Sequence, residues 1–167
     1  MKNITSLLAA TLTLTAASLI AEPTTEAPAT EAPATEKAEA KKADVEITVS
    51  CNDTMKFDTA VIEAKAGQTV QITIKNTGKL PKAAMGHNIV ILNKGIEVMA
   101  WAGKAITAAA TDYVPENAGA DVIAHSKILG PGESEVVTFT VKEAGEYPFL
   151  CSFPGHAGLM KGKVVVK

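Results

Sequence analysis

The chain has 167 residues, which is enough for one domain of ordinary size together with additional segments. It carries 16 basic and 18 acidic side chains, its basic residues are all lysines, and its net charge at pH 7 is −2. The sequence therefore lacks the basic stripe of a nucleic-acid-binding protein and the guanidinium groups that recognise phosphate or carboxylate in bidentate fashion, and we expect no nucleic-acid partner.

The first 21 residues have the pattern of a secretory signal peptide. Lys2 precedes an apolar stretch over residues 4–20, and Ala21 ends it. Because the stretch is short and only weakly apolar, we expect cleavage after Ala21 and no stable membrane insertion afterwards, with an uncleaved anchor as the alternative. No cysteine precedes Cys51, so the signal junction offers no site for lipid attachment. The pattern predicts an exported, periplasmic protein.

Residues 22–43 form a linker rich in Ala, Pro, Glu and Thr. The unit Thr-Glu-Ala-Pro-Ala occurs at residues 25–29 and again at residues 30–34, and the linker contains no Val, Leu, Ile or aromatic residue. Such a composition cannot bury enough apolar surface to offset the entropy lost on ordering. We therefore predict a disordered tether before a domain that spans residues 44–167.

Residues 44–167 have the sequence pattern of a β-domain. Apolar and polar residues alternate along residues 45–51, 68–75 and 137–141, as they do in half-buried strands. Further strands are expected at residues 61–64, 87–93, 146–151 and 161–167, with a loop at residues 79–86. Roughly seven or eight short strands with turn signals between them predict an all-β fold, a Greek-key two-sheet sandwich or barrel.

Residues 94–120 are the exception to this pattern. They are rich in alanine and poor in β-branched residues, and the composition favours a helix over residues 96–110. Trp101, the only tryptophan of the sequence, falls in this segment, and we expect it to pack the helix against the sheets. One side of the expected helix carries Ile96, Met99 and Ala100.

A thiol, an imidazole and a thioether follow one another closely near the C-terminus, as Cys151, His156 and Met160. Together with a second imidazole they form the ligand set of a type 1 (blue) copper site, in which two His and one Cys define a plane and a Met is a long axial ligand. The sequence has three histidines, and His87, which follows Gly86, is the candidate for the second imidazole. In this interpretation Cys151 supplies the thiolate and Met160 tunes the reduction potential.

The loop between Cys151 and Met160 has residues that suit such a site. Pro154 and Gly155 permit the tight path that turns His156 back towards the metal. Asn88, next to His87, is expected to hydrogen-bond to Ser152 and so brace the ligand loop.

A disulfide is the competing interpretation of the two cysteines. Two cysteines in an exported protein ordinarily suggest one bridge, and a bond between Cys51 and Cys151 would remove the thiolate ligand. The ligand spacing of His156 and Met160 and the availability of His87 favour copper.

Several motifs resemble those of the azurins, a branch of the cupredoxins. The resemblance runs in order along residues 44–167 and is most specific in Met-Gly-His-Asn at 85–88, Val-Ile-Ala-His-Ser-Lys at 122–127 and the Cys-x4-His-x3-Met loop that begins at 151. It implies a cupredoxin-like fold with a helical flap outside the sheets, and one copper ion held by His87, Cys151, His156 and Met160. It also implies that the carbonyl group of Gly86 approaches the copper from the side opposite Met160.

The resemblance has further implications for residues outside the ligand set. Azurins usually carry a disulfide at two other positions that are not cysteine here, so Cys51 is expected to be an unpaired thiol in the first strand. His125 matches a histidine at or near the azurin surface and is not expected to bind the copper. Asn76 stands where several azurins have a histidine whose protonation affects the reduction potential, so that coupling should be missing.

An apolar surface around the ring edge of His156 is also implied by the resemblance. Redox partners such as c-type cytochromes or reductases would dock there transiently, over less than about 1,200 Å². The surface, called the His156 patch below, is expected to contain Met55, Leu80, Pro81, Met85, Gly158 and Leu159.

These observations together predict a periplasmic electron-transfer protein that alternates between Cu(I) and Cu(II). An enzyme of the copper nitrite reductase or multicopper oxidase kind is not expected, because further copper sites need further histidines and His125 is the only one left over. The alternative is a copper storage or delivery protein without redox function. An enclosed site of four ligands argues against delivery.

Overall fold

A computed structural model describes residues 42–167. The predicted signal peptide and almost all of the predicted linker lie outside the described residues. The elements, in chain order, are β1 (Val45–Asn52), β2 (Lys56–Phe57), β3 (Val61–Ala64), β4 (Thr69–Asn76), α1 (Lys82–Met85), β5 (Val90–Leu92), α2 (Val98–Ala105), η1 (Ala109–Thr111), η2 (Ala118–Ala120), β6 (Val122–His125), β7 (Ser134–Thr140), β8 (Gly145–Leu150) and β9 (Lys161–Val166).

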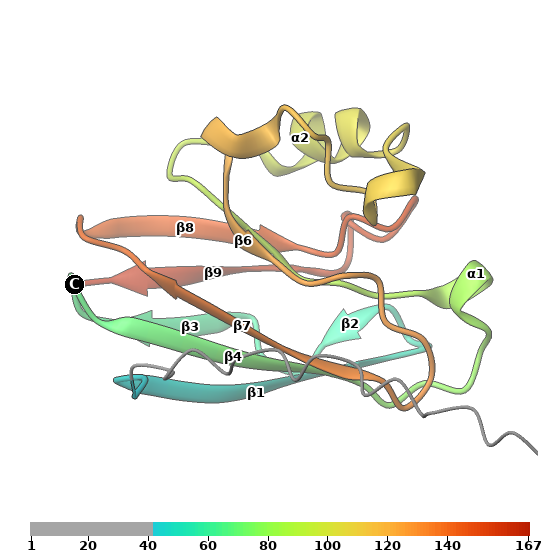
Figure 1. The fold of residues 1–167 in the computed structure, drawn as a ribbon, viewed down its shortest axis with the longest axis horizontal. Helices are drawn as coiled ribbons and strands as arrows, with labels where there is room; N and C mark the ends of the chain where they lie inside the picture. Colours follow the sequence, from blue (N-terminus) through green and yellow to red (C-terminus); the bar gives the residue numbers. More distant parts are fainter. Residues whose placement is uncertain (1–41) are drawn as a thin grey trace, which may run out of the picture. The chain divides into compact units, whose positions relative to one another are not determined.

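The strands form two sheets packed face to face (Figure 1). One sheet has the order β2-β1-β4-β7 and the other the order β3-β9-β8-β5-β6. Most neighbours are antiparallel, but β1 runs parallel to β4 and β3 runs parallel to β9. The predicted two-sheet β-sandwich is confirmed, and the described strands do not close into a barrel.

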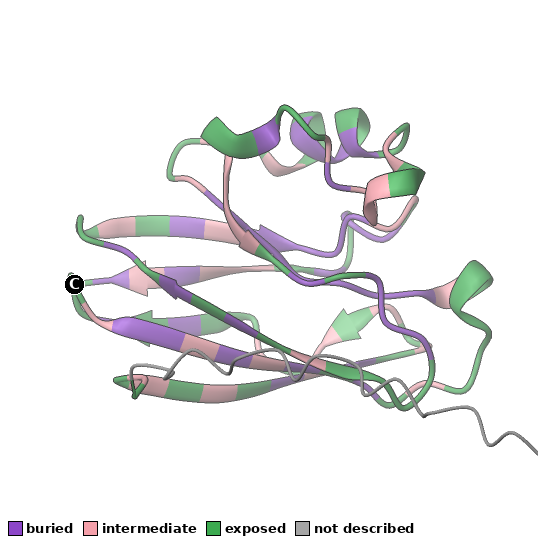
Figure 2. Cartoon of the chain, viewed as in Figure 1, coloured by how far each residue is buried: buried purple, intermediate pink, exposed green. Residues whose placement is uncertain are grey.

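The core lies between the two sheets and follows from the period of two along each strand. In β4, Val70, Ile72 and Ile74 are buried, while Lys75, which follows Ile74, is exposed. Figure 2 shows a similar alternation along β3 and β7, whereas β5 is buried throughout. From the opposite sheet, Phe149 and Val164 complete the layer. Each buried strand face thus carries the apolar half of the alternating pattern.

The helical segment covers the outer side of the five-stranded sheet (Figure 1). Within the predicted helix over residues 96–110, α2 spans only Val98–Ala105, and the Glu97 side chain accepts hydrogen bonds from the first free backbone N–H groups of α2. Trp101 is buried against the sheet, as predicted, in a second apolar cluster with Val90 and Leu150. The helix buries Trp101, Ala102 and Ala105, whereas Met99, on the other side, is 49% exposed.

Three other local predictions need correction. The loop expected at residues 79–86 contains the short helix α1, and the strand expected at residues 87–93 is ordered as a strand only over Val90–Leu92. The edge strand β6 was not predicted, since its four residues carry little apolar alternation and pair with β5 through an irregular register. No helix within residues 42–167 is long and apolar enough to cross a membrane.

Candidate metal centre

His87 reaches the centre from the segment that precedes β5. Its backbone forms an isolated antiparallel bridge with Leu129, in which His87 N donates to Leu129 O at 3.1 Å and Leu129 N donates to His87 O at 2.7 Å. The bridge lies beside the N-terminal end of β5, and the His87 side chain is fully buried. A pairing between residues distant in sequence thus fixes the first imidazole.

The other donor side chains come from the loop between β8 and β9, at the same end of the sandwich as α1 (Figure 1). Cys151 directly follows β8 and Met160 directly precedes β9. The two ends of the loop are joined, because Cys151 N donates to Met160 O and Met160 N donates to His156 O, both at 2.9 Å. Gly155 has a φ of 85°, a conformation that favours glycine and permits the tight turn before His156.

The donor atoms of His87, Cys151 and His156 lie within 4.8 Å of one another. The Cys151 sulfur is 4.0 Å from Nδ1 of His87 and 3.6 Å from Nδ1 of His156. A divalent ion with bonds of about 2.3 Å to sulfur and about 2.0 Å to nitrogen, at trigonal angles, would separate sulfur and nitrogen by about 3.7 Å. The observed spacing therefore fits one metal ion between the three side chains, and the thiolate–imidazole donor set suits copper.

Burial keeps these three groups in their neutral forms when no metal is bound. It raises the pKa of Cys151 to about 11, although the backbone amides of Asn88 and Phe153 act in the opposite direction. It also lowers the pKa of His156 to about 4, helped by the nearby His87. The pKa of His87 is lowered by burial too, against smaller opposing effects of the Asn52 backbone and Asp53. Both imidazoles are thus unprotonated at neutral pH and can bind a metal, whereas the thiol must lose its proton to it.

Asn88 braces the ligand loop as predicted. Its side-chain oxygen accepts a hydrogen bond from Ser152 N at 2.8 Å, and its Nδ2 donates to Ser152 Oγ at 2.8 Å. Both side chains are almost completely buried, so these bonds do not compete with water. The pair joins the residue after His87 to the residue after Cys151.

Met160 and Gly86 occupy positions that agree with a role as ligands but do not test it. The Met160 side chain is fully buried in the same apolar cluster as Cys151. Gly86 is buried between Ile128 and Phe153, and an added Cβ would lie 2.4 Å from Cγ2 of Ile128. The axial thioether and the opposing carbonyl remain predictions.

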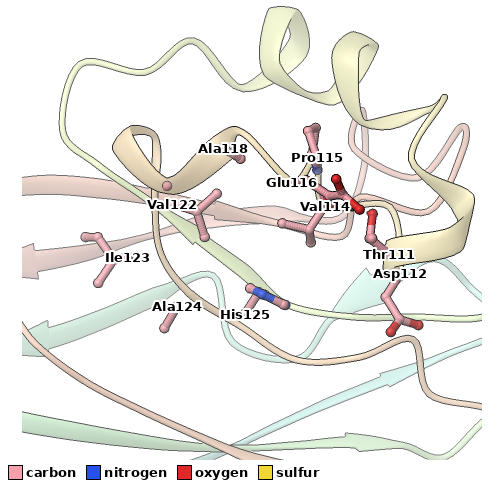
Figure 3. A pocket seen from close by; sticks show the side chains of 11 residues that line it. Thr111, Asp112, Val114, Pro115, Glu116, Ala118, Val122, Ile123, Ala124 and His125 are labelled. Atoms are coloured by element: carbon pink, nitrogen blue, oxygen red, sulfur yellow. Dashed lines mark hydrogen bonds between the residues drawn. The ribbon is translucent and has the colours of Figure 1, made fainter.

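The remaining predicted residues lie outside the donor group. Cys51 is a free, buried thiol in β1, which confirms that it is unpaired, and burial, followed by the charges of Cys151 and Asp58, raises its pKa to about 12. His125 lies at the end of β6, beside a groove of about 500 Å³ between this strand and the helical segment (Figure 3). Asn76 is buried, and its amide donates to Leu129 O at 3.1 Å.

Several residues predicted for the His156 patch are exposed or half-buried, although His156 itself is only 4% exposed. Leu80 is 45% and Leu159 is 59% exposed, and Met55 and Met85 are half-buried. The ring edge of His156 is therefore more enclosed than expected. The Phe153 ring lies beside it, with the ring centroids 4.7 Å apart.

Sequence reasoning missed Leu129 and Asp112. Leu129 pairs with His87, and the Asp112 carbonyl accepts a hydrogen bond from Asn88. Both contacts join residues at least 24 positions apart, so no local spacing in the sequence predicts them.

Comparisons with known proteins agree with this geometry. Residues 43–167 match the family model described as copper binding proteins, plastocyanin/azurin family. The chain is 42% identical over 124 residues to azurin of Alcaligenes faecalis, covering 71% of this chain and 95% of the azurin. It is 44% identical over 122 residues to outer membrane protein H.8 of Neisseria meningitidis, covering 71% of this chain and 66% of that protein. The crystal structure of reduced auracyanin from Roseiflexus castenholzii is similar with a TM-score of 0.66 at 37% identity, over 75% of this chain and 99% of auracyanin.

Proposed function

Since the chain belongs to the plastocyanin/azurin family of copper-binding proteins, we propose that it is a periplasmic carrier of single electrons, with one type 1 copper ion as its cofactor. The observation that carries the proposal is the buried group of one thiol and two imidazoles, spaced for a single ion. When bound, copper supplies the one-electron Cu(II)/Cu(I) couple. His87, Cys151 and His156 would hold it, and Met160 and the Gly86 carbonyl would contribute weaker contacts.

The chain's contribution to electron transfer is to keep the donor atoms at fixed positions. The Leu129 bridge holds His87, the two Asn88–Ser152 hydrogen bonds hold the Cys151 end of the loop, and both sets lie in the interior. Such a frame limits how far the ligands move when the metal changes charge, which favours rapid electron transfer. Burial also excludes water from the thiolate.

A storage or delivery function is less compatible with this arrangement. Delivery requires an open position at which a receiving ligand can attack the metal. The three donor side chains are at most 4% exposed, and Phe153 lies against His156. The same enclosure leaves no position for a substrate, which fits a carrier and not an enzyme.

The His156 patch is the proposed docking surface for redox partners. An apolar area on a chain whose net charge is only −2 supports brief encounters, because neither strong charge attraction nor a large interface holds the complex together. Export is supported by the signal-like sequence of residues 1–21 and agrees with the name of the relative H.8, an outer membrane protein.

Electron self-exchange tests the docking surface, because two patches must meet face to face. Leu159→Glu and Met85→Lys each place a charge that must be desolvated on contact. We expect the self-exchange rate to fall at least about tenfold, which corresponds to about 1.4 kcal/mol, while the visible copper spectrum is unchanged. Val136→Glu is the matched control, since Val136 is 54% exposed on β7, outside the patch. Unchanged self-exchange in both patch variants would show that electrons leave through another face.

A further inference from the structure

The turn at Asp112 and Tyr113, which follows η1 in the helical segment, has an unusual backbone. Its φ angles are 54° and 58°, in the left-handed region that residues other than glycine rarely adopt. Within residues 42–167, Met55 is the only other non-glycine residue with a positive φ. Two such residues in succession are costly and persist where surrounding contacts compensate. Tyr113 N donates to Ala108 O within the helical segment, and the other hydrogen bonds and ring contact of this turn lead to the segments that carry the donor side chains.

The Asp112 carboxylate holds the segment against which His87 rests. Its Oδ1 accepts a hydrogen bond from Ile128 N at 2.9 Å, and Figure 3 shows the carboxylate directed away from the helical segment. The next residue, Leu129, exchanges both backbone hydrogen bonds with His87. Ile128 itself packs tightly on Gly86, where an added Cβ would lie 2.4 Å from its Cγ2. One carboxylate therefore fixes the residues behind Gly86 and His87.

The Asp112 carbonyl is connected to the opposite side of the centre. It accepts a hydrogen bond from Asn88 Nδ2 at 3.1 Å, and the same amide group donates to Ser152 Oγ at 2.8 Å. The Asn88 amide plane is thus fixed on one side by the turn and on the other by the residue that follows Cys151.

The Tyr113 ring extends the contact to the second imidazole of the centre. It packs edge-on against Phe153 with the ring centroids 5.4 Å apart, and Phe153 lies 4.7 Å from His156. The turn therefore contacts the His87 segment, the Cys151 end of the loop and the shield over His156.

We propose that Asp112 is a positioning residue for the copper site, through which the helical flap holds the two donor segments at a fixed separation before copper binds. The inference rests on the proposed function, because the positions it concerns are those of the copper ligands. In this proposal the helical flap positions the copper ligands, although no residue of the flap belongs to the donor group. The carboxylate fixes the His87 side, and the carbonyl, through Asn88, fixes the Cys151 side.

Three substitutions separate the hydrogen bond from the backbone conformation. Asp112→Ala removes the acceptor and strains the left-handed backbone, while Asp112→Gly removes the acceptor and relieves the strain. Asp112→Asn keeps an acceptor for Ile128 N and tolerates the left-handed conformation. Asp121→Ala is the control, since Asp121 lies in the same segment and its side chain makes no hydrogen bond to residues 42–167.

The first measurement is amide hydrogen exchange of the copper-free protein. In Asp112→Ala and Asp112→Gly, the Ile128 and Ser152 amides should exchange at least about tenfold faster than in the wild type, whereas Asp112→Asn and Asp121→Ala should match the wild type. The second is the copper hyperfine splitting of the oxidised, copper-loaded protein. It should change in the Ala and Gly variants and be restored in Asp112→Asn.

The outcomes distinguish this inference from the proposed function. A wild-type protein that forms no blue copper complex would overturn the proposed function. A blue wild type whose Ala and Gly variants keep both exchange rates and hyperfine splitting would overturn the role of Asp112 alone. Faster exchange with an unchanged hyperfine splitting would also overturn it, because the turn would then support only the fold.

Discussion

Replacing Asn88 by Ala removes the brace between the two donor segments. The substitution deletes the acceptor of Ser152 N and the donor to Ser152 Oγ, both at 2.8 Å in a fully buried site, together with the donor to the Asp112 carbonyl. A buried polar group left without a partner costs about 1–3 kcal/mol. The Ser152 N–H has a fixed direction and would lose its hydrogen bond, whereas the Ser152 hydroxyl can rotate towards another partner. We therefore expect the free energy of unfolding to fall by about 2–4 kcal/mol.

Urea unfolding of the copper-free protein measures this loss without a contribution from the metal. Asn93→Ala is the matched control, because the Asn93 amide makes a single exposed hydrogen bond, to Ala120 O at 2.7 Å. Its loss should cost less than about 1 kcal/mol. Equal losses in the two variants would refute the reasoning, since they would mean that the buried Asn88 network is no stronger than a surface hydrogen bond.

Three further predictions follow from the same structure. Met160→Leu should keep the copper and raise the reduction potential, since a weak donor that favours Cu(II) is lost in a drier site; loss of copper binding on titration would show that Met160 is a principal ligand. The copper-free protein should lose stability as the pH falls from 6.5 towards 4, because His156 is protonated in the unfolded chain at a higher pH than in the folded protein. The loss of stability reaches at most about 3 kcal/mol. Thermal unfolding of His156→Gln should show a flatter pH dependence than the wild type, and an unchanged pH dependence would contradict the reasoning. Gly162→Ala should destabilise the domain by about 1–3 kcal/mol or more, because the new Cβ would lie 2.3 Å from Phe149 Cζ and 2.4 Å from Ala60 O. Gly103→Ala is the control, since its new Cβ meets nothing within 4 Å, and a similar melting temperature for the two variants would contradict the packing argument.

The sequence predicted the donor group well because its information is local. Cys151, His156 and Met160 fall on one loop, where spacing alone limits what the side chains can reach. The sequence has only three histidines, and His87 lies in a Met-Gly-His-Asn segment that resembles the azurins, so the second imidazole could be assigned from a short list. The Asn88–Ser152 pair followed once both segments were known to meet at the metal.

Other features could not be predicted because they depend on tertiary contacts. The register that pairs His87 with Leu129, and the hydrogen bond from Ile128 to Asp112, are set by how distant segments pack. The buried face of α2 depends on tertiary packing as well. In an alanine-rich helix no face is much more apolar than another. The bulky Trp101 side chain is the one buried against the sheet, while Met99 remains at the surface.

The visible absorption spectrum of the oxidised, copper-loaded protein tests the central claim most directly. A bond between copper and the Cys151 thiolate predicts an intense blue charge-transfer band, which Cys151→Ser should abolish and Cys51→Ser should leave intact. A colourless complex, or one with only weak metal-centred bands, would contradict a type 1 copper site. Loss of the band in both variants would instead show that the copper site also depends on Cys51.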